Sequence, residues 1–393
     1  MGIRPWALGC RSLPLRGVHH SNTPPKHRNL LLYLHIPFCH RVCPYCSFYK
    51  HTPGATPLGR FIDALAAEAR LRIAAAETPP RTLYLGGGTP SMLSPRHLTR
   101  MFATLHEVID FTRLDEVTLE ANPATFDLSK ARLFRDLGVT RISLGIQSFS
   151  PRVLESLGRE HTPAQAAEAV TFLRKAGIPQ VNIDLMFSVP GQSAAEWQDT
   201  LRQALALMPD HISAYNLTYE EDTAFFEALR RGDASINEDV DAKFFYLTER
   251  LLEAAGFEHY ETSNYARPGM RSSHNRGYWR GEDYLGLGPS AVSTIGALRS
   301  KNIADTARYV EMIHSIGYAI TESDTLDADA RRLERIALGL RTSDGIPIGL
   351  LDPPALARAE VLAQENLARI AAGRLTLVGR GRALVDPIAA ELI

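Results

Sequence analysis

The chain has 393 residues, of which 45% are hydrophobic and 22% charged, and 43 Lys and Arg against 44 Asp and Glu give a formal net charge of −1. These ordinary globular values exclude a disordered or collagen-like chain, and the balanced charge gives no indication of a nucleic-acid partner. The longest apolar run, near Leu30 to Leu34, is far shorter than the roughly 20 residues that span a bilayer, so we expect no integral membrane protein.

Residues 1–29 form a basic segment that we expect to be a disordered tail. The first acidic residue of the chain is Asp63, and the tail combines Arg and Lys with Ser, Pro and His. This composition also fits a transit peptide, so a mitochondrial location is the alternative to the cytoplasm. The tail lacks the apolar core of a secretory signal, and secretion is therefore not expected.

Between residues 30 and 260, short apolar runs alternate with longer amphipathic segments. We expect strands over 30–36, 82–86, 116–121, 141–147, 181–187 and 211–217, and helices over 58–76, 95–109, 128–137, 163–176, 194–208 and 240–255. Repeated β-then-α units build a parallel sheet with right-handed crossovers. Six units are too few for a closed eight-fold barrel, and no phosphate-binding fingerprint follows the first strand. The sequence therefore predicts an α/β fold with an open, partial (β/α)6 barrel over residues 30–260.

The alternation ends beyond about residue 260. Residues 261–300 are interpreted as a loop-rich linker, and residues 301–393 as a smaller, helical, winged-helix-like C-terminal domain. Within this domain, residues 374–385 predict a hairpin that turns at Gly379-Arg380-Gly381. Its arginines are interpreted as a solvated face, because the charge balance of the chain does not favour nucleic-acid binding.

Three of the four cysteines, Cys39, Cys43 and Cys46, fall within eight residues, while Cys10 lies in the tail. This clustering is unlike the spread of cysteines in a secreted disulfide framework. Three thiolates at this spacing can ligate three irons of a 4Fe–4S cubane and leave the fourth iron open. The sequence therefore predicts an iron–sulfur site.

Zinc is the alternative metal, with His35 or His40 as the fourth ligand. Structural zinc sites usually pair two cysteine knuckles, and this chain has one, so we favour the iron–sulfur cluster. Covalent haem attachment through CxxCH is excluded because Ser47 follows Cys46.

The stretch HIPFCHRVCPYC resembles the radical S-adenosylmethionine (SAM) superfamily. In that superfamily the open iron is chelated by the amino and carboxylate groups of SAM, and the cluster cleaves SAM to a 5′-deoxyadenosyl radical. The resemblance covers roughly residues 30–385 and implies a radical SAM barrel. The segment Gly86-Gly87-Gly88-Thr89 is similar to the turn that receives the methionyl amine, where glycines let the backbone approach the ligand. It lacks the Gly-Lys-Ser/Thr of a P-loop.

Within the superfamily, the chain is similar to the coproporphyrinogen III oxidase-like branch. That resemblance implies SAM contacts from Tyr33 and Tyr45, the latter beside the adenine. It also implies that four residues at the branch's spacings bind the ribose and methionyl groups, namely Glu120, Gln147, Arg159 and Asp184.

Two functions compete within this branch: the oxygen-independent coproporphyrinogen III oxidase and the HemW-type haem chaperone. The oxidase carries a further cysteine where this chain has Phe48, and it carries a longer N-terminal arm than the 38 residues that precede Cys39. His274-Asn275-Arg276-Gly277-Tyr278-Trp279 matches the HNxxYW motif of the chaperones. We therefore expect a haem chaperone, with the oxidase as the alternative and another radical SAM reaction as a third option. Whether SAM is cleaved stays open.

The chaperone resemblance implies haem and a haem-accepting protein, such as a respiratory membrane subunit, as partners. His274 is the expected axial ligand, with Tyr278 and Trp279 packed on the porphyrin; the alternative is that all three are structural. Two departures from the chaperones are Ser47 in place of an acid and Ser290-Ala291-Val292 in place of Gly-Ala-His. The run GLGPSA mimics a dinucleotide fingerprint but lacks the strand-then-helix context.

Overall fold

The computed structural model describes residues 29–54 and 56–393. The prediction of a disordered tail and the isolated Cys10 fall almost wholly outside the described residues. Within the described part of the chain, no helix has the length and apolar character needed to cross a membrane.

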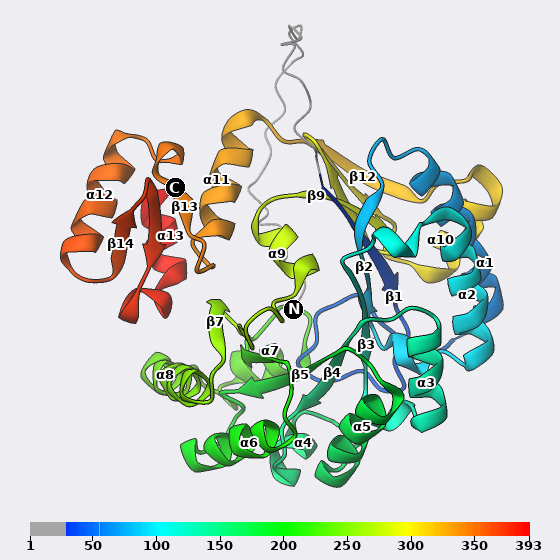
Figure 1. The fold of residues 1–393 in the computed structure, drawn as a ribbon, viewed down its shortest axis with the longest axis horizontal. Helices are drawn as coiled ribbons and strands as arrows, with labels where there is room; N and C mark the ends of the chain where they lie inside the picture. Colours follow the sequence, from blue (N-terminus) through cyan, green and yellow to red (C-terminus); the bar gives the residue numbers. More distant parts are fainter. Residues whose placement is uncertain (1–28, 55) are drawn as a thin grey trace, which may run out of the picture.

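Six parallel strands form the centre of the molecule, and their spatial order follows the chain (Figure 1). They are β1 (Leu30–Ile36), β2 (Pro80–Gly87), β3 (Glu116–Ala121), β4 (Arg141–Gln147), β5 (Gln180–Phe187) and β6 (His211–Asn216). The helices between them are α1 (Leu58–Ala74), α2 (Pro95–Val108), α3 (Leu128–Asp136), α4 (Pro151–Ser156), α5 (Pro163–Ala176) and α6 (Ala194–Ala206). Two further helices, α7 (Ala224–Arg231) and α8 (Glu238–Ala254), follow β6, and the Phe225 N–H of α7 donates to the Pro44 carbonyl in the cysteine loop. The predicted partial barrel is confirmed, with element ends within a few residues of those expected.

Local sequence signals explain the helix ends. At the start of α5, the Thr162 side chain accepts from the backbone N–H of Gln165, whose side chain accepts from the backbone N–H of Thr162, and Pro163 holds the first helical position. The same helix ends at Gly177, which has φ 79° and so takes the left-handed conformation that favours glycine. These caps fix where each crossover leaves and rejoins the sheet.

The sheet extends beyond the six predicted strands to twelve. On one side, β9 (Asp283–Leu287) pairs parallel with β1 and is followed outward by β10 (Val292–Ile295), β11 (Leu298–Asn302) and β12 (Ile320–Thr325). On the other side lie β8 (Asn264–Ala266) and β7 (Glu258–Glu261). The remaining helices of this part are α9 (Ser273–Trp279) and α10 (Thr306–Ile316). The expectation of a loop-rich linker over 261–300 is therefore wrong, because these residues build sheet strands and a helix.

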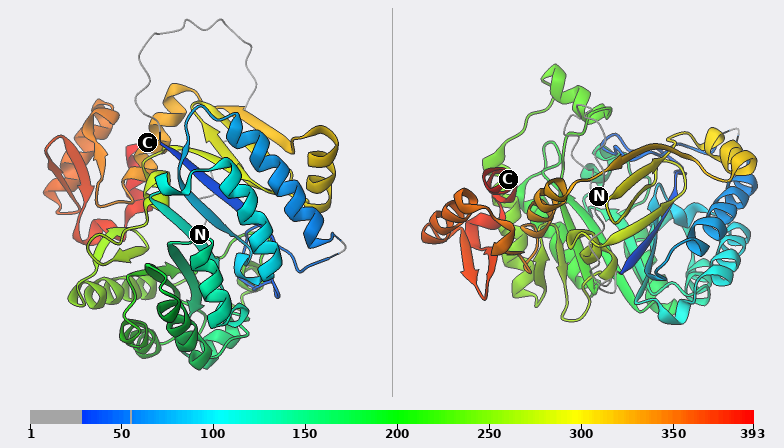
Figure 2. Two further views of the ribbon diagram at one scale, coloured as in Figure 1. Left: turned by 45° about the vertical axis from the view of Figure 1, so that its right-hand side comes forward. Right: turned by 90° about the horizontal axis from the view of Figure 1, so that it is seen from above.

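A second hydrophobic core belongs to the C-terminal part, which stands beside the barrel in Figures 1 and 2. It contains α11 (Ala328–Gly339), α12 (Pro353–Gln364) and α13 (Val385–Leu392), with an antiparallel sheet of β13 (Ile346–Pro347), β15 (Arg374–Leu377) and β14 (Ala368–Ala371). The C-terminal domain was predicted to begin at residue 301, but its core begins with α11. The strands β11 and β12 belong to the large sheet, and α10 packs in the core of the barrel. Short 3-10 helices lie in the barrel at Pro90–Met92, Phe111–Arg113 and Pro123–Thr125, and in the C-terminal part at Ile348–Leu350 and Gly379–Arg382.

The C-terminal hairpin lies at a different place from the one predicted. Its strands are β14 and β15, and its turn is Ala372-Gly373, with φ 49° and 72°. Positive φ at both positions is typical of the two-residue turns that match strand twist. Gly381 serves close packing instead, since a Cβ there would lie 1.9 Å from the carbonyl oxygen of Leu367.

Candidate functional site

The residues expected to bind SAM gather at the carboxyl ends of the parallel strands. Gly87 ends β2, Glu120 lies near the end of β3, Gln147 ends β4 and Asp184 lies in the second half of β5. The carboxyl ends of neighbouring parallel strands share one edge, where α/β folds place their ligands. All nine residues predicted for SAM are half-buried rather than packed away: Tyr33, Tyr45, Gly87, Gly88, Thr89, Glu120, Gln147, Arg159 and Asp184.

The cysteine loop follows β1 and is closed at its base by backbone hydrogen bonds. The Cys39 N–H donates to the carbonyl of His51 at 3.0 Å, and the His51 N–H donates to the carbonyl of Pro37 at 2.8 Å. Within the loop, the Cys46 N–H donates to the carbonyl of Cys43 at 3.2 Å, which forms a tight turn between these two thiols. The loop therefore presents all three cysteines from one closed segment.

Two side chains from outside the loop reach the cysteine sulfurs: Thr89 follows β2, and Arg159 lies between α4 and α5. The Thr89 hydroxyl lies 3.5 Å from Cys39 Sγ, and Arg159 Nη1 lies 3.7 Å from Cys43 Sγ. Hydrogen-bond donors and positive charge of this kind stabilise thiolate sulfur. Burial raises the pKa of Cys39 to about 11, so a metal at this thiol must displace a proton.

Two observations bear on the choice between an iron–sulfur cluster and zinc, namely the spacing of the sulfurs and the contacts of the neighbouring histidine. A tetrahedral zinc with Zn–S of about 2.3 Å holds its sulfurs about 3.8 Å apart. Among the described residues, the three cysteine sulfurs do not all lie within 4.8 Å of one another, whereas a cubane spreads its ligands over separate irons. His35 is engaged through both ring nitrogens, Nδ1 with the Tyr33 hydroxyl at 3.0 Å and Nε2 with the Tyr49 carbonyl at 2.7 Å. Of the two histidines that could complete a zinc site, His35 is therefore engaged, whereas His40 is exposed.

Close packing, and not ligand access alone, explains why side chains are absent from the triple glycine. Gly87 has φ 106°, and a Cβ there would lie 2.5 Å from the His35 ring. A Cβ on Gly88 would lie 2.7 Å from the carbonyl oxygen of Phe38. The close approach lets Gly88 N–H donate to Ile36 and Thr89 N–H donate to Phe38, both at 2.7 Å. The glycines therefore hold the end of β2 against the start of the cysteine loop.

Glu120 is held by two donors from β2. The Tyr84 hydroxyl donates to Glu120 Oε1 at 2.8 Å, and the Gly87 N–H donates to Oε2 at 3.1 Å. Burial raises the pKa of this carboxyl. Tyr84 was not identified from the sequence, although it aims Glu120 toward the glycine turn.

The end of β4 is strained and holds two polar atoms without partners. Gln147 has φ 70°, which is rare outside glycine, and the β4–β5 ladder is irregular between Gly145 and Gln147. Arg159 Nη2 donates to the Gly145 carbonyl at 2.6 Å. Within the described chain, Gln147 Oε1 and Arg159 Nε are buried and have no hydrogen-bond partner. Such orphaned polar atoms at a strained strand end are typical of a ligand site.

Asp184 is oriented by its neighbours on the sheet. Ser143 Oγ donates to Oδ2 at 2.9 Å, and Asn182 Nδ2 donates to Oδ1 at 2.7 Å. Tyr45, between two of the cysteines, packs against Phe225 with ring centroids 6.4 Å apart. Asp184 thus lies near the end of β5 and Tyr45 in the cysteine loop, and their roles in SAM binding stay predictions.

A second polar layer fills the barrel below the strand ends. Glu116, Arg141 and His211 are each at most 4% exposed, and they belong to the first residues of β3, β4 and β6. His211 Nδ1 pairs with Asn182 Oδ1 at 2.6 Å, and His211 Nε2 pairs with the Tyr260 hydroxyl at 2.7 Å. This buried polar layer was not predicted from the sequence, although every second residue of β3 to β6 is polar along most of the strand. That period-two pattern marks a polar barrel interior.

The HNxxYW helix α9 closes the amino-terminal end of this interior. Its His274 is fully buried, with Nδ1 2.8 Å from the Thr82 hydroxyl and its ring stacked on Tyr84 at 4.9 Å. Burial lowers the pKa of His274 to about 3, so the ring is neutral. The ring is fully buried, and within the described residues its Nε2 has no hydrogen-bond partner, so axial ligation of haem by His274 stays a prediction.

The other two motif residues differ in accessibility from His274. Tyr278 and Trp279 are half-buried, and Tyr278 packs edge-on against His274 and Tyr284, each at 4.9 Å. Trp279 lines a small pocket between α9 and the C-terminal part. The Trp279 end of the motif is therefore more accessible than its His274 end.

Glu261 adds an ionisable group with an unusual pKa to the barrel wall. It ends β7, is 3% exposed, and within the described residues its Oε1 has no hydrogen-bond partner. Burial raises the pKa of this carboxyl from 4.5 to about 7. The folded state thus binds a proton that the unfolded state has already released.

The free energy of unfolding should therefore fall as the pH rises from about 4.5 to about 7. The change attributable to Glu261 is about 3 kcal/mol. In Glu261→Gln this part of the pH dependence should vanish, so that urea midpoints of the two proteins diverge with rising pH. Parallel midpoint curves from pH 4 to 8 would show that Glu261 is an ordinary, hydrated carboxylate.

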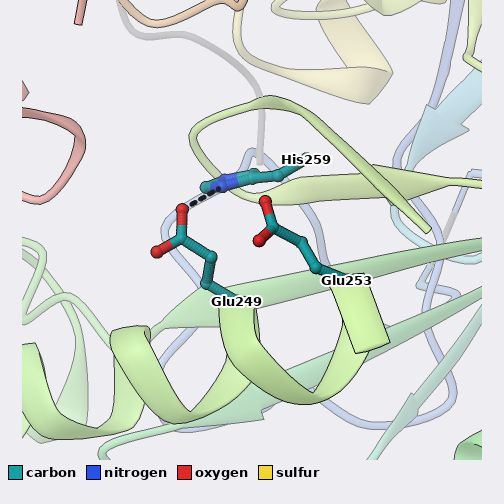
Figure 3. A group of neighbouring side chains, drawn as sticks. All are labelled: Glu249, Glu253 and His259. Carbon is teal, nitrogen blue, oxygen red and sulfur yellow. Dashed lines mark hydrogen bonds and ion pairs between the residues drawn. The ribbon is translucent and has the colours of Figure 1, made fainter. Parts of the chain in front are cut away.

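Figure 3 shows a further group of potential metal ligands, Glu249, Glu253 and His259. Both glutamates already form ion pairs with Arg382 from the C-terminal part, whose Nη1 lies 2.6 Å from Glu249 and 3.4 Å from Glu253. His259 also stacks on Tyr265 at 4.2 Å. We interpret the group as an ion-pair contact that ties the C-terminal part to α8.

The chain is similar to known proteins over most of its length. Residues 33–204 match the family model described as "Radical SAM superfamily". The chain is 37% identical to a "Heme chaperone HemW" of Mycobacterium tuberculosis over 92% of this chain and 94% of that protein. It is also 33% identical to "Radical S-adenosyl methionine domain-containing protein 1, mitochondrial" of Danio rerio, over 85% of this chain and 78% of that protein.

Among solved structures, the coproporphyrinogen III oxidase HemN of Escherichia coli shares the fold. The TM-score is 0.79, with coverage of 93% of this chain and 90% of that one. The identity is 23%, so this likeness establishes the architecture and leaves the activity to the site.

Proposed function

The chain belongs to the HemW haem chaperone family of the radical SAM superfamily, and from this premise we propose that it binds haem and passes it to an acceptor protein. The observation that carries the proposal is the relation to the chaperones over nearly the whole chain. Membership of the superfamily implies a 4Fe–4S cluster and SAM.

Within this proposal, Cys39, Cys43 and Cys46 hold the cluster. The closed loop supports this assignment, as do the donors that Thr89 and Arg159 direct at two of the sulfurs. When bound, the cluster supplies an open iron that SAM can chelate. The chain's own contribution is to fix the three thiols at one edge of the barrel and to keep polar groups beside them.

The same edge is proposed to bind SAM. Glu120 and Asp184 offer acceptors to the ribose or amine, and Gln147 and Arg159 present the unpartnered atoms described above. Tyr33, Tyr45 and the turn of Gly87, Gly88 and Thr89 complete the predicted set. Acceptors that are held in place before the ligand arrives lose little freedom on binding.

Glu120→Ala should weaken SAM binding and leave the cluster in place. Loss of a charge-assisted hydrogen bond costs about 1.5–3 kcal/mol, or roughly tenfold to a hundredfold in affinity. Calorimetry on the reconstituted protein measures this, with Glu107→Ala on the exposed face of α2 as the matched control. Equal SAM affinity in both variants would make Glu120 a purely structural residue of β3.

The oxidase is the competing function, and Phe48 argues against it because the oxidases carry a cysteine there. A chaperone must also release its haem. Loaded protein mixed with a haem-free acceptor such as apomyoglobin should transfer haem, seen as the acceptor's absorbance. Retention of all haem over hours would contradict the chaperone role. The physiological acceptor is proposed to be a respiratory subunit, and the location the cytoplasm, or the mitochondrion if the basic tail directs the protein there.

A further inference from the structure

Three arginines surround the small pocket at the end of α9. The pocket is lined by residues of the barrel side and of the C-terminal part, namely Tyr260, Arg271, Arg276, Trp279, Arg280, Thr342 and Asp344. Arg276 occupies a variable position of the HNxxYW motif, and Arg280 directly follows the motif. The motif pattern therefore does not account for either arginine.

The charges around the pocket are not balanced. All three arginines share the carboxylate of Asp344, with N–O distances of 3.9 Å for Arg271, 3.7 Å for Arg276 and 2.9 Å for Arg280. One further carboxylate, Glu258, pairs with Arg271 at 3.0 Å. Three guanidinium groups thus face two carboxylates, and each guanidinium carries five N–H donors. The pocket keeps positive charge and spare donors for an incoming anion.

Of the three arginines, Arg276 has the weakest ion pairing. Within the described chain, its only ion pair is the 3.7 Å contact to Asp344, and its side chain is 31% exposed. Arg280 is 44% exposed. To turn toward a ligand, Arg276 and Arg280 give up ion pairs with Asp344 alone among the described residues, whereas Arg271 is also held by Glu258 and lies over the Tyr260 ring at 5.5 Å.

We propose that this pocket binds the propionate carboxylates of haem through Arg276 and Arg280, with the porphyrin ring lying outside it against Trp279. The assignment rests on the proposed function. The pocket is small, so it accepts carboxylate groups rather than a macrocycle. Guanidinium groups match carboxylates through paired hydrogen bonds, and a half-buried indole offers a flat apolar face beside them. Asp344 acts as an internal competitor that holds the arginines when haem is absent.

The location separates haem from SAM. Ser272 and Ser273, at the start of α9, bond to Glu116, the first residue of β3, whereas the cysteine loop follows the opposite end of β1. The two ligands therefore bind at opposite ends of the barrel strands and do not compete for the same contacts.

The test is haem titration of the reconstituted protein and of the double variant Arg276→Gln/Arg280→Gln. The matched control is Arg100→Gln/Arg358→Gln, which removes two exposed arginines that each pair with one carboxylate elsewhere. The dissociation constant for haem should rise about tenfold or more in the pocket variant, as expected for loss of charge-assisted contacts, and stay unchanged in the control. Haem dimethyl ester, which lacks both carboxylates, should bind wild type and pocket variant with equal, weaker affinity.

A second variant changes affinity in the opposite direction. Asp344→Asn frees the arginines from their competitor, so haem should bind severalfold more tightly than to wild type. A structural ion pair would give no such gain, and the variant keeps the test valid if the double variant folds poorly. Equal haem affinity in the pocket variant and its control, or equal binding of haem and its ester by wild type, would overturn the proposal. Failure of wild type to bind haem at all would instead refute the proposed function.

Discussion

Replacing Cys43 with alanine should leave the protein without its cluster. After anaerobic reconstitution, wild type should hold about four irons per chain, the content of one cubane. Cys43 supplies one of three thiols from a closed loop, and neighbouring ring nitrogens such as those of His35 are already engaged. Within the described residues, the other two free thiols, Cys39 and Cys46, are already ligands of the proposed cluster, so we expect iron and the cluster absorbance to fall to background.

Cys10→Ala is the matched control, because this cysteine lies far from the cluster motif in the sequence. It should keep the full iron content. Cys39→Ala and Cys46→Ala should behave like Cys43→Ala. A complete cluster in any of these three variants would contradict the assignment of the ligand set.

Replacing Glu116 with alanine should cause the largest loss of stability among side chains near the HNxxYW motif. This buried carboxylate accepts hydrogen bonds from Ser273 N–H at 2.7 Å, Ser272 Oγ at 3.0 Å and Thr118 Oγ1 at 2.9 Å. It also attracts the buried guanidinium of Arg141. Removing one partner from a buried charged network costs about 3–5 kcal/mol.

Urea unfolding followed by tryptophan fluorescence measures this loss. Glu116→Gln keeps an acceptor oxygen and should be less destabilised than Glu116→Ala, whereas Glu107→Ala on the exposed face of α2 should match wild type. If Glu116→Ala unfolds at the same urea concentration as wild type, then Glu116 does not anchor α9.

The sequence predicts the central barrel well because its strands are buried on the helix-facing side and its helices carry local stop signals. The runs at 116–121 and 141–147 form strands with the expected ends. The pairing of β9 with β1 could not be predicted, because it joins residues about 250 positions apart and the short DYLGL run has no distinctive period. The C-terminal hairpin was misplaced because Ala372-Gly373 is a weak turn signal beside the glycines at 379 and 381.

Of the candidate site, too, the sequence predicts one part and not the other. Motif spacing predicts the three cysteines as cluster ligands, and strand order brings Glu120, Gln147 and Asp184 to one edge. Spacing alone does not report burial, and so His274 was expected to face a ligand although it packs inside the barrel. The arginines near Trp279 were not singled out because Asp344, their shared partner, is 64 residues from Arg280 in the chain.

The central claim is that this radical SAM protein carries haem rather than decarboxylating coproporphyrinogen. One reconstituted sample, titrated with haem and then supplied with coproporphyrinogen III, SAM and a reductant, tests both halves of the claim. We predict about one haem per chain, as a single binding motif allows, and no vinyl-bearing porphyrin product. Decarboxylation at enzyme-like rates, commonly about 1 s⁻¹ or faster, together with the absence of haem binding, would contradict it.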